Sequence, residues 1–407
     1  VDGGGERVTY NFSGNFYDDD GFNNVNQQRR LGFRSTVGAK VSERVQYTGS
    51  AAFQSNYFTR DYNANTSFAR YGNLEGGSFG DISALTPEER ENLAANLEEQ
   101  GELTDITESV RRFQTSHTIE YNPFKNFDIR ATVGLDSRRS FARDISTNAL
   151  LVSKGAVAPG TDDQGSINTA ERNFLSVTGD LNMQYRIETG DFSFITGAGG
   201  QIFRNKDEQL EIFATNVFEG SETINNAADV QATDFLREVV FGGFYFSENI
   251  GWKNRLFLDA AIRFDGNSAY GEEVGLVDIF RLGMTYSLTD ESFMQSGPIS
   301  RIITAMRFRA NYGQATNFPT PFANDRTFAA NPFLGALTLT FGNPGDPNLG
   351  PEVVNSFEFG ADMSFIDGRV GVSVTRYDNT TEDALLTLPS APSSGQLSQL
   401  RNVGEIS

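Results

Sequence analysis

Hydrophobic and polar residues alternate along most of this chain. In the segment Ser356–Phe365, one set of alternate positions is apolar and the other is mainly polar. The apolar set is Phe357, Phe359, Ala361, Met363 and Phe365. Successive side chains on a β-strand point to opposite faces, so this pattern predicts strands with one apolar and one polar face. The same pattern occurs in Val8–Tyr17, Arg30–Val41, Arg44–Ser55, Phe127–Asp136, Leu175–Ile187, Arg255–Asp265, Phe280–Leu288 and Met306–Gly313.

The predicted strands are long. Strands of globular proteins usually have about 5–6 residues, whereas a strand that crosses a bilayer needs about 9–11. Phe127–Asp136 alone provides 10 alternating residues. The length therefore favours membrane-spanning strands. A large soluble β-sandwich or β-solenoid would also alternate, so the pattern alone leaves that alternative open.

Short and long connectors follow one another along the chain. The short ones lie near 41–44, 122–125, 188–190 and 367–368. The long ones are expected at roughly 18–28, 56–108, 138–168, 205–232 and 313–350. Outer-membrane β-barrels have short periplasmic turns and long extracellular loops. The connectors thus predict an all-β, antiparallel transmembrane β-barrel, with about 13 complete strands and the start of another near Gln396–Val403.

A helix is expected inside the connector 56–108. Thr86 suits the N-cap position, a proline follows it, and Glu89 completes a capping box. Gly101 is a natural stop. The sequence therefore predicts a short helix near 87–100, within a long extracellular loop that is folded and not an open tether.

Charge and composition exclude several classes of protein. With 53 acidic and 33 basic residues, the formal net charge is −20, which argues against nucleic-acid binding. No run approaches 18 apolar residues and no signal peptide opens the chain. The acidity is concentrated in two connectors, 81–108 and 205–234, and we interpret these charges as those of solvated loops. The alternative is a loop that binds cations or repels anionic ligands.

Catalytic and metal-binding chemistry has little support in the sequence. There is no cysteine and only one histidine, His117, which by parity falls on an apolar face and lacks an evident serine and carboxylate. Asp18, Asp19 and Asp20 are consecutive, unlike the alternate acids of an EF-hand, so they indicate a solvated turn. We expect no enzyme activity, no metal and no cofactor.

Aromatic residues also collect in the expected loops. They are Tyr57, Phe58, Tyr62, Phe68, Tyr71 and Phe79, and later Phe318, Phe322, Phe328 and Phe333. Exposed rings with polar neighbours suit contact with a sugar, a peptide or a protein lid. The alternative is that the rings pack the long loops on one another.

Several stretches resemble the SusC/RagA class of TonB-dependent outer-membrane transporters. Residues 251–271 are similar to the strand and loop "RxDGSSxFG" of that class, and 307–317 to "LRASYGxTGN". Residues 346–360, followed by Tyr377 and Asp378, are similar to "NPxLxPExxxSFExGxD…YYD". Residues 10–21 are similar to the hairpin "YxxSGxY…xxG", which comes before these segments in proteins of that class. The matches occur in the order of the family and extend over most of the chain.

The resemblance implies a barrel of 22 strands with an N-terminal plug in its lumen. It further implies energy from the TonB complex and, in many members, a SusD-like surface lipoprotein that closes over the barrel. The cargo would be a glycan, an oligosaccharide or a peptide. Residues 1–407 would be a partial barrel domain of about 13–14 strands, without plug, TonB box or terminal strands. Four arginines of the polar faces would hold the plug by ion pairing: Arg255, Arg263, Arg307 and Arg309.

We therefore expect TonB-dependent import of a nutrient across the outer membrane of a Gram-negative cell. Two alternatives stay open. One is a soluble, β-rich surface protein for binding or adhesion, and the other is a hydrolase built on an outer-membrane barrel.

Overall fold

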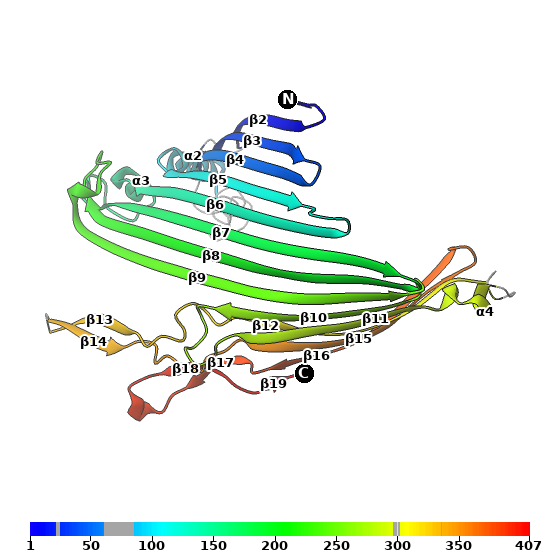
Figure 1. The fold of residues 1–407 in the computed structure, drawn as a ribbon. Coiled ribbons are helices and arrows are strands. Elements are labelled where there is room, and N and C mark those ends of the chain that lie inside the picture. Colours follow the sequence, from blue (N-terminus) through cyan, green and yellow to red (C-terminus); the bar gives the residue numbers. More distant parts are fainter. Residues whose placement is uncertain (22–24, 61–84, 296–298, 300–301, 335) are drawn as a thin grey trace.

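The computed structural model describes residues 1–407 except 22–24, 61–84, 296–298, 300–301 and 335. One antiparallel 15-stranded sheet dominates it, in the order β1 to β12, β15, β16 and β19 (Figure 1). Two separate two-stranded hairpins, β13–β14 and β17–β18, complete the β structure. The all-β expectation is confirmed, and the sheet curves into an open trough (Figure 1).

The elements have the following bounds. The strands are β1 (Asp2–Gly4), β2 (Val8–Asp20), β3 (Gln27–Ser42), β4 (Val45–Thr59), β5 (Asp105–Tyr121), β6 (Phe127–Ser146), β7 (Gly165–Thr189), β8 (Phe192–Val217), β9 (Ala227–Trp252), β10 (Leu256–Asn267), β11 (Val277–Ser287), β12 (Ile303–Asn317), β13 (Phe328–Phe333), β14 (Ala336–Phe341), β15 (Glu352–Phe365), β16 (Val370–Glu382), β17 (Leu385–Pro389), β18 (Ser398–Asn402) and β19 (Glu405–Ile406). The helices are α2 (Pro87–Glu102), α3 (Asn148–Ser153) and α4 (Ser292–Gln295), with 3-10 turns η3 (Ile224–Asn226), η4 (Leu288–Asp290) and η6 (Pro392–Ser394).

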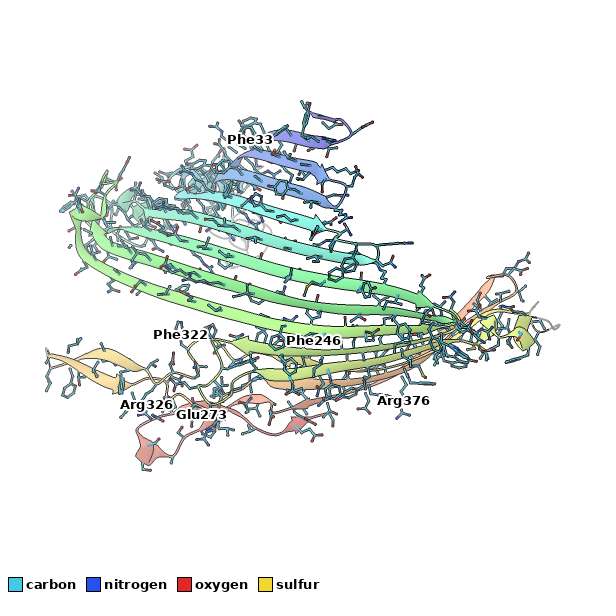
Figure 2. The ribbon with its side chains drawn as sticks, in the orientation of Figure 1. Phe33, Phe246, Glu273, Phe322, Arg326 and Arg376 are labelled. Carbon is cyan, nitrogen blue, oxygen red and sulfur yellow. The ribbon has the colours of Figure 1, made fainter. Side chains whose placement is uncertain are left out.

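The strand register gathers the apolar residues on one face of the sheet. Phe33 is opposite Phe53, and Phe53 is opposite Phe113. Four strands after β5, Phe246 of β9 is opposite Ile262 of β10 in the same way. These rings are not covered by protein, since Phe33 is 55% and Phe246 54% exposed (both are labelled in Figure 2). A continuous uncovered apolar face is what the lipid of a bilayer requires.

Several strands run much further than the alternation predicts. The expected connectors 138–168 and 205–232 are wrong over much of their length, because β6, β7, β8 and β9 continue into them; β8 and β9 have 26 residues each. The register continues through these extensions, with Leu210 opposite Asp234. Both faces of an extension are wet, so no period of two marks it in the sequence.

Three smaller expectations from the sequence are also wrong, because the residues concerned belong to other elements than the pattern predicts. Asp18, Asp19 and Asp20 are the last residues of β2 and not a turn. Much of the acidity of 205–234 lies on the paired strands β8 and β9 and not in a loop. The strand expected near Gln396–Val403 is β18, which pairs with β17 in a separate hairpin and does not extend the sheet.

The two ends of the sheet differ. The four tight connections predicted near 41–44, 122–125, 188–190 and 367–368 are confirmed, and they lie at the end that carries α4. A fifth joins β9 to β10, where Lys253 and Asn254 adopt positive φ angles of 50° and 52°. Helices α2 and α3 and the hairpin β13–β14 lie at the opposite end (Figure 1).

The predicted helix is present as α2. The hydroxyl of Thr86 accepts from the backbone N–H of Glu89, and the Glu89 carboxylate accepts from Thr86, which completes the capping box. The helix passes through Gly101, so the predicted stop is wrong; Leu103 is the C-cap. In the described part of the chain, no helix has the length and apolarity to cross a membrane.

Helix α2 is docked on α3. The side-chain amides of Asn96 and Gln100 both donate to the carbonyl oxygen of Ser153, at 3.3 and 3.1 Å. Helix α3 is anchored in turn by Asn148, which is 1% exposed and donates to the carbonyl oxygen of Val217. A small core lies beside it, made of Ile145, Ile167, Ala214 and Val217. These contacts fold the long-connector end into a structured unit.

Candidate functional site

The polar face of the sheet carries a series of ion pairs. Asp136 of β6 accepts from the Nε of Arg112 of β5 at 2.9 Å, and Asp207 of β8 accepts from the Nε of Arg172 of β7 at 2.8 Å. Further pairs on this face include Arg130–Glu120, Arg186–Asp128, Arg263–Asp265 and Arg309–Asp362. A face so rich in paired charges is suited to water, and in a barrel it lines the lumen.

A polar hollow of about 510 Å³ lies on this face across β3 to β7. Arg34, Gln114 and Asp136 supply its charged and amide groups. Six residues with hydroxyl side chains also line it: Thr36, Ser50, Thr115, Ser116, Ser176 and Thr178. Such a wall can exchange hydrogen bonds with a hydroxylated or amide-bearing ligand. Single small residues on five strands have no local signal, so the hollow is not recognisable from the sequence.

An aromatic cluster lies where β8, β9 and β12 approach the long-connector end. The ring of Phe241 is 4.7 Å from Phe203 and 5.1 Å from Phe318 between centroids. Tyr270 follows, with its ring 6.1 Å from Phe318. The guanidinium of Arg263 lies over the Phe241 ring, at 5.5 Å from the centroid. The cluster therefore connects aromatic rings of the long-connector end to the charged polar face of the sheet.

Asp265 connects the aromatic cluster to the charged polar face of the sheet. It is 3% exposed, and its Oδ1 accepts from the Nε of Arg263 at 2.6 Å. Its side chain occupies the space that a Cβ atom would fill at Gly243. Tyr270 is 6% exposed, and within the described residues its hydroxyl has no hydrogen-bond partner. Burial and, to a smaller extent, the charge of Asp265 raise the pKa of Tyr270, so the phenol is neutral.

Backbone hydrogen bonds hold the connectors around the cluster. The N–H of Gly271 donates to the carbonyl of Leu349 at 2.8 Å, and the N–H of Glu273 donates to that of Pro347 at 3.0 Å. The Asn324 amide donates to the carbonyl of Tyr270 at 2.9 Å. Figure 2 shows Glu273, Phe322 and Arg326 at this end of the sheet. The connectors after β10 and β12 thus form one hydrogen-bonded platform.

The aromatic residues selected from the sequence do not form a single site. Phe318 belongs to the cluster, whereas Phe328 and Phe333 are on β13, where Phe328 lies 5.6 Å from Phe341. Phe322 is 46% exposed on the platform. Tyr57 and Phe58 lie at the end of strand β4 and not in a loop. Tyr62, Phe68, Tyr71 and Phe79 lie outside the described residues.

Three of the four selected arginines have carboxylate partners in this chain. Arg263 and Arg309 belong to the pairs described above, and Arg255, beside the β9–β10 turn, binds Glu291 at 2.7 Å. Arg307 forms no ion pair with any residue that the structure describes, although Asp362 lies opposite it in the register.

Two further observations concern catalysis and metal binding. His117 lies on the apolar face, as its parity predicts, opposite Gly49. Its Nδ1 is 2.7 Å from the Tyr47 hydroxyl and its Nε2 is 3.0 Å from the Thr115 hydroxyl. Among the described side chains, no three His, Cys, Asp or Glu residues come together as ligands for a metal ion.

Known proteins are similar to this chain in sequence and in fold. The family model "TonB dependent receptor-like, beta-barrel" matches residues 41–407. TonB-dependent receptor P26 of Formosa agariphila is 25% identical over 433 residues, which is 100% of this chain and 41% of that protein. TonB-dependent receptor P39 of the same organism is 26% identical over 60% of this chain and 24% of its own length.

Solved structures of other proteins are similar to this chain in fold. The RagAB peptide transporter superposes with a TM-score of 0.78 and 15% identity, over 99% of this chain and 46% of that one. The ferric-catecholate import receptor Fiu of E. coli K12 gives a TM-score of 0.56 and 14% identity, over 97% of this chain and 57% of that one. The chain spans about half the length of these relatives or less. On the family match, it belongs to the TonB-dependent receptor-like β-barrel family of the outer membrane, which consists of transporters and not of enzymes.

Proposed function

We propose that the protein to which this chain belongs imports a nutrient, an oligosaccharide or a peptide, across the outer membrane with energy from the TonB complex. The observation that carries the proposal is the two-faced sheet of a family member, with an uncovered apolar face outside and a charged, hydroxyl-lined face inside. Residues 1–407 then supply part of the barrel wall, and the segment between β4 and β5 is an extracellular loop.

The ligand class rests on the polar hollow and on exposed aromatic rings at the long-connector end. Hydroxyls, an amide and an arginine in the hollow can bind sugar hydroxyls or peptide amides. Phe318, Phe322, Phe328 and Phe333 present rings at the long-connector end. The solved RagAB structure is that of a peptide transporter and has a closer fold than the siderophore receptors, which favours a peptide.

Two partners follow from the proposal. The TonB complex would act through a plug domain in the barrel lumen, and Arg307 is the best placed of the four arginines to bind that plug because it has no ion-pair partner in the described chain. A surface lipoprotein would close the barrel from the long-connector end. The exposed rings of Phe328 and Phe333, 53% and 65% exposed, are suited to that contact.

Uptake by cells tests the function. Deletion of the gene should abolish growth on a defined oligosaccharide or a defined peptide mixture as sole nutrient, and loss of the TonB protein should have the same effect. If the deletion strain fails to grow on peptides but still grows on oligosaccharides, the cargo is a peptide. Unchanged growth and uptake of every oligosaccharide and peptide tested in the deletion strain would refute nutrient import.

The plug contact has its own test in the full-length protein. Arg307→Glu should loosen the plug and increase passive leakage of small solutes through the barrel. Arg34→Glu, on the same polar face but in the hollow, is the control for a change of charge. Equal leakage in Arg307→Glu and in the unmodified protein would contradict plug binding by Arg307.

A further inference from the structure

The membrane-facing wall has a groove of about 500 Å³ between β9 and β15. Ala260 and Ala310 provide small side chains, and Leu258, Leu282 and Met284 provide larger ones. Glu248 also lines the groove, but its carboxylate accepts from the hydroxyl of Thr196 at 2.7 Å. Thr196 belongs to β8, on the far side of β9, and the other carboxylate oxygen of Glu248, Oε1, is buried without a hydrogen-bond partner among the described residues. The groove is therefore mainly apolar, with one carboxylate at the β9 side.

Its position relative to the turns places it in one leaflet. Ile250 lies two residues before the end of β9 at Trp252, and Phe357 lies eight before the end of β15 at Phe365. At about 3.3 Å per residue and a tilt of about 40°, the groove extends from roughly 5 to 20 Å above the tight turns. The hydrocarbon core of a bilayer is about 30 Å thick. The groove thus lies mainly in the leaflet on the side of the turns, which is the periplasmic side of such barrels.

A cation and an indole ring lie at the turn end of the groove. Trp252 is on the apolar face, two positions from Ile250, and the Lys253 ammonium lies 5.1 Å from the centre of its ring. Tryptophan and lysine are the residues that anchor proteins at the level of lipid headgroups. Lys253 also meets Asp191 at 3.4 Å, but both side chains are exposed, so that pair is weak and leaves ammonium donors for another anion.

We propose that this groove is a binding site for one phospholipid of the periplasmic leaflet. One acyl chain lies along Ala260 and Ala310, and the phosphate is bound by Lys253 beside Trp252. The groove is continuous with the lipid-contacting face, which makes a membrane lipid the natural occupant. The site is on the outer wall, so it is separate from the import path inside the barrel.

Native mass spectrometry of the full-length protein tests the proposal, with phosphatidylethanolamine as the added lipid in detergent. One phospholipid should stay bound per barrel at lipid concentrations where other sites are empty. Ala310→Phe should fill the groove and reduce retention at least tenfold. Lys253→Gln should reduce it severalfold and leave the groove itself unchanged.

The control is Ala131→Phe, which adds the same ring to the apolar face on β6, outside the groove, and should leave retention unchanged. If Ala310→Phe does not fold, Ala260→Phe fills the neighbouring part of the groove. Equal retention by the groove variants and the control would overturn the proposal. So would a wild-type protein without bound phospholipid, or one that retains only lipopolysaccharide. None of these results depends on nutrient import.

Discussion

Arg263 and Asp265 lie two positions apart on the polar face of β10, and their ion pair depends on a glycine of the neighbouring strand. The Asp265 carboxylate lies where a Cβ atom at Gly243 would be, and the backbone of Phe264 is also close to that point. Gly243→Ala must therefore displace Asp265 from Arg263. We expect a loss of about 1–3 kcal/mol of unfolding free energy, measured by denaturant unfolding of the full-length protein in micelles.

The adjacent glycine is the control for that substitution. A Cβ atom at Gly242 would meet its nearest neighbours at 3.7 and 3.9 Å, which is ordinary contact. Gly242→Ala should change the unfolding free energy by less than about 0.5 kcal/mol. Equal losses in the two variants would show that the Arg263–Asp265 pair is not the cause.

Tyr270→Phe should leave stability at neutral pH unchanged or raise it by about 1 kcal/mol, because the lost hydroxyl is buried without a partner. Tyr312→Phe is the matched control: its hydroxyl donates to Asn355 at 2.9 Å, so this variant should lose stability. Unfolding of both variants in denaturant at pH 7 gives the comparison. A clear loss in Tyr270→Phe would indicate a partner for the hydroxyl.

The pH dependence of Tyr270 has a definite sign. Its pKa is raised above the usual 10.0 in the folded protein, so between the two pKa values the native state holds a proton that the unfolded state has lost. Stability should therefore fall as the pH rises above about 10. The wild type should lose more stability than Tyr270→Phe in an alkaline titration of the unfolding midpoint. Parallel curves would contradict the raised pKa.

The membrane-spanning half of each strand is predictable from sequence because lipid imposes a period of two. Phe357 to Phe365 shows that period, and the register confirms it. The extensions of β8 and β9 show none, since water is on both faces and any polar residue is acceptable there. The capping box at Thr86 is a local signal, so it is found.

The candidate site is harder to predict because its parts come from distant segments. Phe203, Phe241 and Phe318 meet only through the pairing of β8 with β9 and the path of the connector after β12. No spacing of residues along the chain predicts these contacts. The hydroxyls of the hollow are likewise ordinary strand residues until the register brings them together.

Arg172→Ala should destabilise the protein more than the loss of an exposed ion pair does. Asp207 is 7% exposed, and it accepts two bonds from Arg172. Removal of the arginine leaves a buried carboxylate without its cation, but Arg172 is half exposed, so water replaces part of the interaction. We expect a loss of about 1–3 kcal/mol in denaturant unfolding.

Arg29→Ala provides the comparison for Arg172→Ala. Arg29 and Asp18 are both well exposed, with 64% and 45% of their side chains accessible, and the ion pair measures 3.2 Å. That variant should lose less than about 1 kcal/mol. If the two losses are equal, burial of Asp207 does not contribute to the strength of its pair.

The capping box of α2 gives a prediction at acid pH. Hydrogen bonds from the backbone and the hydroxyl of Thr86 lower the pKa of Glu89 below its usual 4.5. A lowered pKa in the folded state means that the stabilisation is complete above the usual value and is lost as the pH falls through the folded one. Amide exchange in α2 should therefore accelerate on acidification relative to α3, after correction for the intrinsic pH dependence of exchange.

Thr86→Ala removes two hydrogen bonds, the one that the hydroxyl donates to the Glu89 carboxylate and the one that it accepts from the Glu89 N–H. Exchange in the first turn of α2 should therefore be severalfold faster at pH 7 and should depend less on pH. Glu91→Gln changes one charge on the same helix without touching the cap, and it should preserve the wild-type exchange pattern. Because α2 is held on α3 through Asn96 and Gln100, at the far end from the cap, the effect of Thr86→Ala should fade toward Ser153. Uniformly faster exchange along α2 and α3 would instead mean that the cap controls docking of the whole helical unit.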